Sequence, residues 1–291
     1  MLNTSVSKIG FVGAGVMGSS MAKNLLKGGF DVHLYTRTKE KAGELLELGM
    51  IWHDTPGELA RHCDAVISIV GYPQDVRELY LGEGGIVQSA KPGAYLIDMT
   101  TSSPELAKRI HEAAASKGLH ALDAPVSGGD VGARNAALSI MVGGDQASFE
   151  SVRPLLEMLG KNIVRQGGPG AGQHTKMVNQ IAIASNMVGV CEALVYAKHA
   201  GLDLNSVLAS IESGAAGSWS LSNLAPRIIQ GNFDPGFYVK HFIKDMGIAL
   251  EAAEEMGIEL PGLTLAKGLY EKIAAAGLAD NGTHALYKAW D

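Results

Sequence analysis

The sequence predicts an α/β domain with a mostly parallel sheet, followed by an all-α domain that a long helix joins to it. Up to about residue 166, short apolar runs alternate with amphipathic helical patterns, which is typical of βαβ units. After Gly172 the strand patterns stop and only helical periodicity continues. The chain has 291 residues, and a single hydrophobic core stops growing at roughly 250–300 residues. We therefore expect two domains, at 1–166 and 167–291.

The first domain is expected to hold a series of buried strands. The runs are apolar throughout rather than alternating, as in strands that helices cover on both faces. The expected strands are 9–13, 32–36, 65–70, 95–100, 120–126, 138–144 and 162–167. The expected helices among them are 16–27, 39–48, 104–117 and 147–159.

The second domain begins with a helix expected over about 173–200. Its apolar residues Met177, Ile181, Ala184 and Val188 recur at intervals of three and four, and Gly201 ends the pattern. The further expected helices are 205–213, 220–229, 239–256 and 262–276.

The composition is that of an ordinary globular protein, with 46% hydrophobic and 19% charged residues. The net charge of −6 argues against a surface for nucleic acid, and no run of about 18 apolar residues predicts a membrane helix. Cys63 and Cys191 stand in apolar contexts without metal-ligand spacing, so we expect two buried thiols in a reducing compartment and no metal site. The N-terminus lacks the apolar core of a signal peptide, so a cytoplasmic location is expected.

A glycine motif follows the first expected strand and opens an amphipathic helix. Gly13, Gly15 and Gly18 have the GxGxxG spacing, which is weak alone but specific in this strand–helix context. In such a loop the first glycine permits the turn, the second admits a pyrophosphate and the third allows close packing. The motif predicts a Rossmann domain that binds a dinucleotide through Gly13, Ala14, Gly15, Val16, Met17 and Gly18. A glycine-rich junction without a ligand is the alternative.

The second expected strand ends without the acidic residue that usually binds the adenosine ribose in NAD sites. It is followed by Thr36, Arg37 and Thr38. A guanidinium and two hydroxyls suit a 2′-phosphate, so we expect NADP to be preferred, with NAD possible. The alternative is that Arg37 is a solvated charge at the start of a helix.

The segment "SGGDVGA" ends an apolar run in an unusual way, because a turn alone needs one glycine. Ser127, Gly128 and Gly129 would leave several backbone N–H groups close together, with a hydroxyl beside them. The glycines let a small acid come near the backbone. We expect this segment to bind a small anion, and a sharp turn is the alternative.

Four blocks occur in order along nearly the whole chain: "GFVGAGVMG", "DAPVSGGDVGA", "GAGQHTKMVNQ" and "KDMGIAL". In these blocks the sequence resembles the β-hydroxyacid dehydrogenase family, which includes 3-hydroxyisobutyrate dehydrogenase and tartronate semialdehyde reductase. The resemblance implies a Rossmann domain, an interdomain cleft and NAD(P)-dependent hydride transfer between the nicotinamide C4 and the β-carbon of a short hydroxy acid or semialdehyde. It also implies a homodimer or homotetramer.

The resemblance implies a role for particular residues. Lys176 matches the catalytic lysine and is expected to act as general acid/base. Asn179 matches a substrate-binding asparagine, and Gln180 departs from the family's second asparagine but keeps an amide. The carboxylate-binding positions match Ser127, Gly128 and Gly129. The cofactor-binding positions match Thr101 and Lys244, with Val70 and Gly71 on the adenosine side.

The spacing of the residues agrees with this assignment. Lys176 and Asn179 are three apart, so they share one face of the expected long helix. A surface lysine is the alternative, as is a surface ion pair for Lys244 with Asp245 or Glu251. Trp219 and Phe242 are candidate pocket walls, although core packing is the commoner role.

Three alternative functions remain open at this point. An imine reductase of similar architecture usually lacks the catalytic lysine. A 6-phosphogluconate dehydrogenase would need a larger helical domain. A non-catalytic dinucleotide-binding sensor would be expected to lack Lys176 or the "SGG" segment, and both are present.

Overall fold

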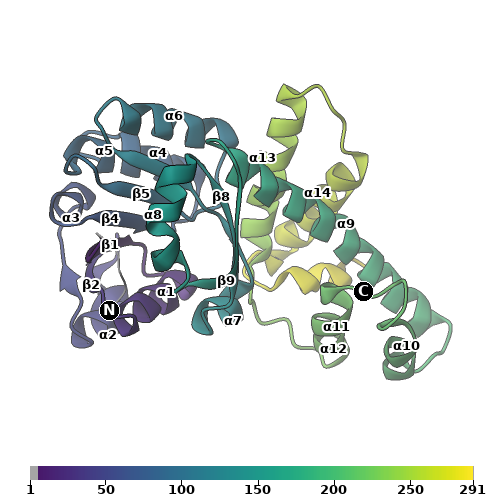
Figure 1. Ribbon diagram of the computed structural model, residues 1–291. Helices are drawn as coiled ribbons and strands as arrows, with labels where there is room; N and C mark the ends of the chain where they lie inside the picture. The colour runs from purple at the N-terminus through teal and green to yellow at the C-terminus, as the bar shows by residue number, and fades with distance from the viewer. Residues whose placement is uncertain (1–5, 291) are drawn as a thin grey trace. The chain divides into compact units, whose positions relative to one another are not determined.

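The computed structural model describes residues 6–290, which divide into two compact units, the first ending at Lys176 and the second beginning at Met177 (Figure 1). The division lies beyond the expected boundary at 166/167 because β9 (Gly160–Gly167) still belongs to the sheet of the first unit. The first turn of the following helix is also bonded to that unit through Asp123.

The first unit is built on a nine-stranded sheet with the order β3-β2-β1-β4-β5-β6-β8-β7, and β9 pairs with β8. Strands β1 to β6 are parallel, and β8 runs antiparallel to β6 and β7, so the expected mostly parallel sheet is confirmed. Phe11 lies opposite both Leu34 and Ile67, and all three are buried. The bounds are β1 Lys8–Val12, β2 Asp31–Tyr35, β3 Ile51–Trp52, β4 Ala65–Ser68, β5 Tyr95–Asp98, β6 His120–Asp123, β7 Val126–Ser127 and β8 Leu138–Gly143.

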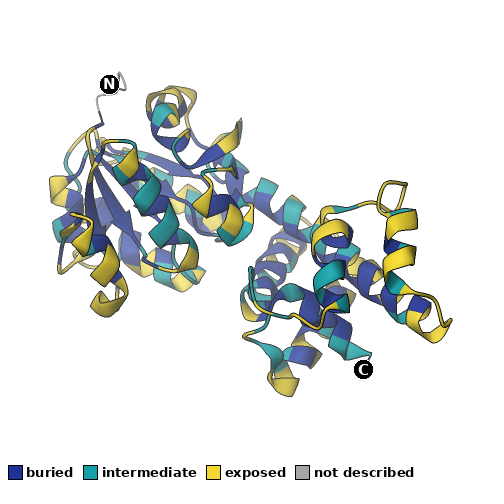
Figure 2. Cartoon of the chain, turned by 90° about the horizontal axis from the view of Figure 1, so that it is seen from below, coloured by how far each residue is buried: buried dark blue, intermediate teal, exposed yellow. Residues whose placement is uncertain are grey.

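Helices cover both faces of the sheet, and each face has its own apolar core (Figure 2). One core receives side chains from α1 (Val16–Lys27), α2 (Gly43–Glu47), α7 (Gly129–Arg134) and α8 (Gln146–Leu156), with η1 (Lys39–Ala42) before α2. The other receives them from α3 (Pro56–His62), α4 (Pro73–Leu81), α5 (Ile86–Ser89) and α6 (Pro104–Ala115).

One expected strand of the first unit was wrong in detail, and the alternative weighed for one segment does not hold. The expected strand 120–126 is two strands, because Pro125 has no N–H to donate and the chain changes partner there. The segment "SGGDVGA" is more than a turn, since Gly129 begins the short helix α7. Four short elements were not expected: the two-residue strand β3 and the helices α3, α4 and α5. Each holds too few residues to show a clear periodicity of apolar side chains.

The second unit is all-helical around one core, as expected. Its elements are α9 (Ala171–His199), which starts in the first unit, α10 (Leu204–Ile211), α11 (Trp219–Asn223), α12 (Ala225–Ile229), α13 (Val239–Glu255), α14 (Pro261–Ile273), η2 (Ala274–Leu278) and η3 (Thr283–Ala289). Gly201 has φ +72° and follows the end of α9. The expected helix 220–229 is broken at Leu224, because Pro226 cannot continue a helix from the preceding turn.

The two aromatic residues considered as pocket walls differ. Phe242 lies in the core of the second unit, with its ring centroid 5.1 Å from that of Tyr270. Trp219 is 69% exposed, so the expectation that it packs in the core was wrong. Trp219 is the first residue of α11, whose buried residues are Ser220 and Leu221.

Helix α9 is long and apolar enough, by length and composition, to cross a membrane. It is not the uninterrupted apolar run that a membrane helix usually shows, because Lys176, Gln180 and Glu192 interrupt it. Its residues Ala184, Cys191 and Leu194 are buried in the core of the second unit. A core helix passes the same test, so the length of α9 is weak support for a membrane segment.

Candidate functional site

The loop between β1 and α1 has the geometry of a dinucleotide-binding turn. Gly13 has φ +108°, and a Cβ on it would lie 2.2 Å from the Ile69 carbonyl oxygen. A Cβ on Gly18 would lie 2.1 Å from the Gly13 carbonyl oxygen, so these two glycines are required by the fold. A Cβ on Gly15 would meet no atom within 4 Å. The backbone at Gly15 is therefore open to a ligand at the N-terminus of a 12-residue helix, as a pyrophosphate requires.

Thr36, Arg37 and Thr38 follow the end of β2, and an acidic residue that the sequence did not predict lies beside Arg37. The Arg37 guanidinium is largely exposed, with its Nη1 2.9 Å from Asp75 Oδ1. The other oxygen of Asp75 accepts a bond from the Tyr72 N–H at the start of α4. The local sequence predicts no acidic residue here, but the fold brings Asp75 from 38 residues further along the chain. A pattern local to β2 could not have revealed it.

The loops after β4 and β5 are bonded to each other. The Val70 N–H donates to Thr100 Oγ1 at 3.0 Å, and the Thr100 N–H donates to Asp98 Oδ1 at 3.1 Å. Burial raises the pKa of Asp98 to about 6, although the hydrogen bonds from Thr100 and Ser68 oppose the rise. Thr101 is half-buried next to this network. The loops at Val70 and Thr101, which are expected to bind the cofactor, are therefore held by the same hydrogen-bond network.

The expected anion-binding segment contains two successive glycines with positive φ, +128° at Gly128 and +60° at Gly129. Ser127 ends β7 and is half-buried. The first intrahelical bond of α7 runs from the Gly132 N–H to the Gly128 carbonyl. The N–H groups before Gly132 therefore have no partner within the helix, as at every helix N-terminus. This arrangement agrees with the expected concavity.

Lys176 is on α9, and its environment excludes the surface alternative. It is 7% exposed. The helix begins against β6, where Asp123 accepts bonds from the backbone N–H groups of Gly170 and Gln173, both at 2.8 Å. Burial raises the pKa of Asp123, and these backbone bonds oppose the rise. Asp123 and Gln173 were not singled out from the sequence, although an acid at a strand end and a glutamine in the lysine block were both visible.

The site residues of the second unit are joined by two hydrogen bonds and an ion pair. Asn179 Nδ2 donates to Gln180 Oε1 at 2.7 Å, and Gln180 Nε2 donates to Asp245 Oδ2 at 2.6 Å. Lys244 Nζ lies 3.0 Å from Asp245 Oδ1, with side chains 12% and 2% exposed. The ion pair considered for Lys244 thus exists, but it is buried. The departure of Gln180 from the family pattern has a use here, because its longer amide reaches Asp245.

The structure brings the other expected residues together within the first unit. The parallel strands align Val12 with Tyr35 and Ser68, and Ser68 with Asp98, so their carboxyl ends share one edge. The glycine loop and the segments after β2, β4 and β5 all follow that edge, which is where ligands bind in such sheets. Helix α7 packs against α1, and Asn24 Nδ2 donates to the Ala133 carbonyl at 2.8 Å.

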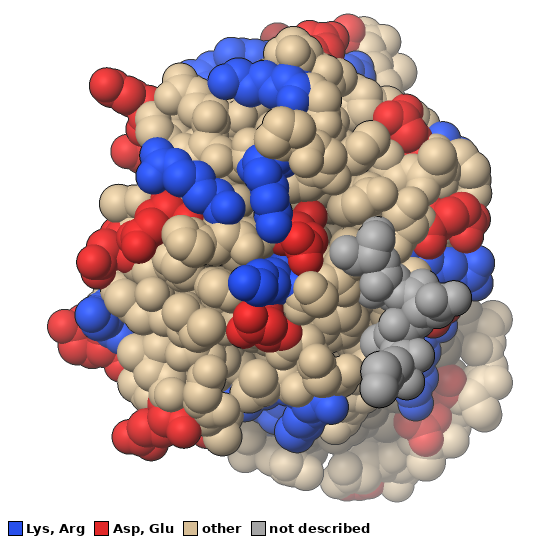
Figure 3. Space-filling model, turned by 60° about the vertical axis from the view of Figure 1, so that its left-hand side comes forward, with Lys and Arg blue, Asp and Glu red and all other residues tan. Residues whose placement is uncertain are grey.

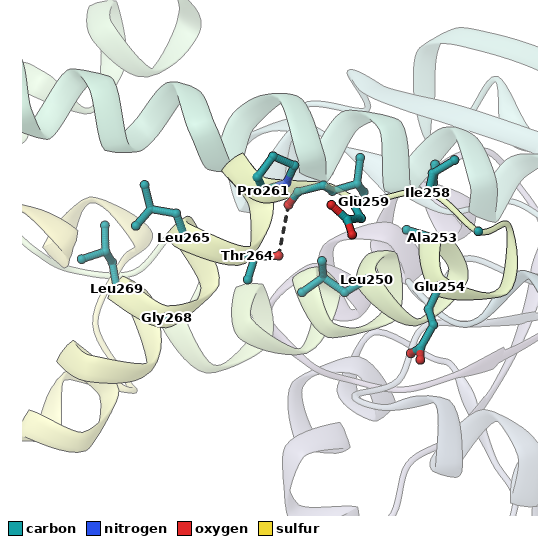
Figure 4. Close-up of a pocket in the computed structure, with 12 residues that line it drawn as sticks. Leu250, Ala253, Glu254, Ile258, Glu259, Pro261, Thr264, Leu265, Gly268 and Leu269 are labelled. Carbon is teal, nitrogen blue, oxygen red and sulfur yellow. Dashed lines mark hydrogen bonds between the residues drawn. The ribbon is translucent and has the colours of Figure 1, made fainter.

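The pocket of the second unit is lined by none of the expected site residues. A pocket of about 900 Å³ lies in the second unit between α13 and α14 (Figure 4). Apolar residues such as Leu250, Ile258 and Leu265 line it, with Glu254 and Glu259 beside them. On the face drawn in Figure 3, basic and acidic side chains are interspersed. Among residues 6–290, no group of three or more His, Cys, Asp or Glu is arranged to hold a metal ion.

Both cysteines are buried and free, as expected. Burial raises the pKa of Cys63 to about 12 and also raises the pKa of Cys191. Neither thiol is therefore suited to act as a nucleophile at neutral pH.

Two family models match nearly the whole chain. The NAD binding domain of 6-phosphogluconate dehydrogenase matches residues 8–168, and the NAD-binding domain of NADP-dependent 3-hydroxyisobutyrate dehydrogenase matches residues 170–290. The chain is 62% identical to the uncharacterized oxidoreductase YkwC of Bacillus subtilis, over 97% of this chain and 98% of that protein. It is 46% identical to the probable 3-hydroxyisobutyrate dehydrogenase-like 1 of Arabidopsis thaliana, over 99% of this chain and 86% of that protein. It is 39% identical to the 2-hydroxy-3-oxopropionate reductase of Escherichia coli, over 97% of this chain and 96% of that protein.

The solved structures agree with the sequence relatives. The 3-hydroxyisobutyrate dehydrogenase of Mycobacterium tuberculosis, solved with L-serine, has a TM-score of 0.89 and 31% identity, over 97% of this chain and 98% of that chain. Imine reductases share the fold at TM-scores of 0.62 to 0.66 with 17 to 20% identity. The models, the relatives and the Rossmann geometry together show that the chain belongs to the β-hydroxyacid dehydrogenase family and is an NAD(P)-dependent oxidoreductase acting on CH–OH groups.

Proposed function

We propose that the protein is an NADP-preferring dehydrogenase of a short β-hydroxy acid, or the reductase of the corresponding semialdehyde, with Lys176 as general acid/base. The observation that carries the proposal is the burial of Lys176, 7% exposed, on a helix that starts against the strand end beside the cofactor loops. Lysine is among the residue types least often buried in folded proteins. The bound nicotinamide supplies or accepts the hydride.

Each residue of this chain then has a defined task. In the reductive direction the Lys176 ammonium donates a proton to the carbonyl oxygen as it becomes an alkoxide, and in oxidation the amine removes it. The Ser127 hydroxyl and the N–H groups of Gly128 and Gly129 bind the substrate carboxylate. Asn179, one turn beyond Lys176, offers its amide to the substrate. Anchoring both ends of a short acid orients the reacting carbon, which is a large part of catalysis.

The NADP preference rests on the exposed Arg37 guanidinium with Thr36 and Thr38 on either side. A guanidinium binds a 2′-phosphate through paired N–H donors. Asp75 neutralises part of this charge, so we propose a preference rather than strict selection. Lys244, held by the buried Asp245, is proposed to serve the nicotinamide end.

We also propose that the protein is a homodimer or homotetramer. The pocket between α13 and α14 exposes Ile258 and Leu265, which are 50% and 60% exposed. Monomeric proteins rarely leave large contiguous apolar patches uncovered. A second copy of the chain is the occupant we propose for this surface.

The test is the change in absorbance of the reduced nicotinamide, measured with NADP and NAD in parallel. The panel contains 3-hydroxyisobutyrate, glycerate, tartronate semialdehyde and L-serine, with cyclic imines as the rival class. We expect turnover of one of the acids with NADP preferred. Turnover of imines alone would favour the imine reductase, and tight cofactor binding without turnover would favour a sensor.

The role of Lys176 is tested by Lys176→Ala. Loss of the acid/base group is expected to lower kcat by about 10²–10⁴-fold while cofactor binding is retained. The matched control is Lys198→Ala, which removes an exposed lysine from the other end of the same helix. Near-native turnover of Lys176→Ala with bound cofactor would refute the assignment.

A further inference from the structure

The side-chain amide of Gln173 joins the first turn of α9 to the loop that carries Thr101. Gln173 is fully buried. Its Nε2 donates to the Thr100 carbonyl oxygen at 2.7 Å, and its Oε1 accepts from the Ser102 N–H at 2.9 Å. The amide therefore binds the backbone on both sides of Thr101, as an adjacent strand would.

Asp123 fixes the other end of this link. Its two oxygens accept bonds from the N–H groups of Gln173 and Gly170. A Cβ on Gly172 would lie 2.3 Å from the Met141 carbonyl oxygen, so the start of the helix rests directly on the sheet. The backbone of Gln173 has little freedom to move, and its amide is held at a fixed place.

Gln173 thereby connects three parts of the proposed site. Lys176 lies three residues further along the helix, on the same face, and is also buried. On the opposite side of the amide, Thr100 Oγ1 accepts the Val70 N–H, which ties in the loop after β4. The cofactor loops and the helix of the proton donor are linked through a single side chain.

We propose that Gln173 is a positioning residue, whose amide sets the placement of Thr101 relative to Lys176. The proposal rests on the proposed function, in which Lys176 moves the proton, and on the cofactor-binding role that the family resemblance implies for Thr101. Gln173 is fully buried, so it acts through these two residues.

The chemistry of the link requires a donor and an acceptor at the end of one side chain. Glutamate has the same shape and still accepts from Ser102, but its carboxylate would face the Thr100 carbonyl with no proton between two acceptors. Only the protonated carboxyl can donate there. Gln173→Glu should therefore lose activity at high pH and regain it as the pH falls. Leucine removes both bonds at similar volume.

The experiment measures kcat, KM and cofactor affinity for both variants. Gln173→Leu is expected to lower kcat by about 10–100-fold, because misplacement of about 1 Å has effects of that size. The Kd of the reduced cofactor, followed by its fluorescence, is expected to stay within about threefold, since the glycine loop is untouched. Gln173→Glu is expected to match the leucine variant at pH 8 and to recover at least about fivefold, relative to wild type, at pH 5.5.

The matched control is Asp64→Asn. Asp64 accepts backbone N–H bonds from Ser7 and Lys8, as Asp123 does from the helix, but it precedes β4 and so lies at the opposite edge of the sheet. Its loss weakens the fold without reaching the site, so kcat is expected to stay within about twofold of wild type.

A folded Gln173→Leu variant with kcat within about twofold of wild type would overturn the proposal. If that variant does not fold, a pH profile of Gln173→Glu parallel to wild type would overturn it. Hydrogen–deuterium exchange gives a readout without turnover, because the Ser102 amide loses its acceptor in Gln173→Leu and should lose protection, whereas Gln173→Glu should retain it. Unchanged protection of Ser102 in Gln173→Leu would contradict the link. If the wild-type protein turns over none of the acids, the proposed function fails, and exchange at Ser102 still tests the link by itself.

Discussion

The three glycines of the first loop have different physical tasks, which can be separated by substitution. A Cβ on Gly18 collides with the backbone of Gly13, whereas a Cβ on Gly15 meets only open space. Gly15 also has φ −77°, which any residue can adopt. The fold therefore requires Gly18, whereas Gly15 is the glycine that we expect cofactor binding to require.

We expect Gly15→Val to leave the free energy of unfolding within about 0.5 kcal/mol of wild type while weakening cofactor binding at least tenfold. Gly18→Ala is expected to destabilise the fold by about 1–3 kcal/mol because backbone atoms must move. Urea unfolding and fluorescence titration of the reduced cofactor measure the two effects. Unweakened cofactor binding by Gly15→Val would contradict the assignment of this loop.

Asp75 should oppose the NADP preference that we propose Arg37 to provide. Its carboxylate neutralises the guanidinium and would repel a 2′-phosphate. We expect Asp75→Ala to raise the ratio of kcat/KM for NADP over NAD by about threefold or more, and Arg37→Asp to lower it by about tenfold or more. Asp280→Ala, which breaks an exposed pair with Lys240 in the second unit, is the control. A preference that Arg37→Asp leaves unchanged would refute the 2′-phosphate role.

At the scale of elements, Asp64 ties β1 to the turn before β4. Burial favours its neutral form, but bonds from Lys91 and from the N–H groups of Lys8 and Ser7 outweigh burial and lower the pKa of Asp64 to about 2. Because the pKa of this carboxyl is lower in the folded state, its charged form stabilises the fold at pH values above the unfolded pKa near 3.8. That stabilisation is lost as the pH falls from 3.8 toward 2.

Asp64→Asn is therefore expected to lower the free energy of unfolding by roughly 2 kcal/mol at pH 7 and by progressively less below pH 4. Lys91→Met, which keeps both backbone bonds, is expected to show less than half of that effect. Urea unfolding at pH 7, 4 and 3 distinguishes the two variants. An equal deficit for Asp64→Asn at every pH would show that the loss is packing rather than charge.

The elements that the sequence predicts well are those with a long run of periodically spaced apolar residues or a specific motif. Helix α1 was expected at its observed bounds, and α9 within two residues at its start, because both have clear apolar periodicity and glycine ends. Short elements were missed, and the break at Leu224 was overlooked although Pro226 signals it.

For the site, local blocks predicted which residues gather at the sheet edge. The Arg37–Asp75 pair and the Gln173 link join residues 38 or more apart, so local patterns could not predict them.

At the scale of the whole molecule, assembly is the proposal that a single measurement decides. Light scattering of the purified protein is expected to give two or four times the chain mass of 30.5 kDa. Leu265→Glu places a charge on an exposed position of α14, so the fold should persist while the assembly weakens. A mass of one chain for the wild type would contradict the proposal, and an unchanged mass for the variant would place the contact elsewhere.

The two adjacent glycines of the segment proposed to bind the substrate carboxylate, Gly128 and Gly129, limit how this enzyme can be re-engineered. Gly128 has φ +128°, a conformation that side chains rarely adopt, and Gly129 has φ +60°, which only asparagine and aspartate tolerate at modest strain. In a saturation library, almost every variant at Gly128 should be lost to misfolding before its selectivity can be assayed. Diversity directed at Ser127, whose backbone is an ordinary strand end, is free of that constraint. Attempts to widen the substrate range should therefore begin beside the glycines rather than on them.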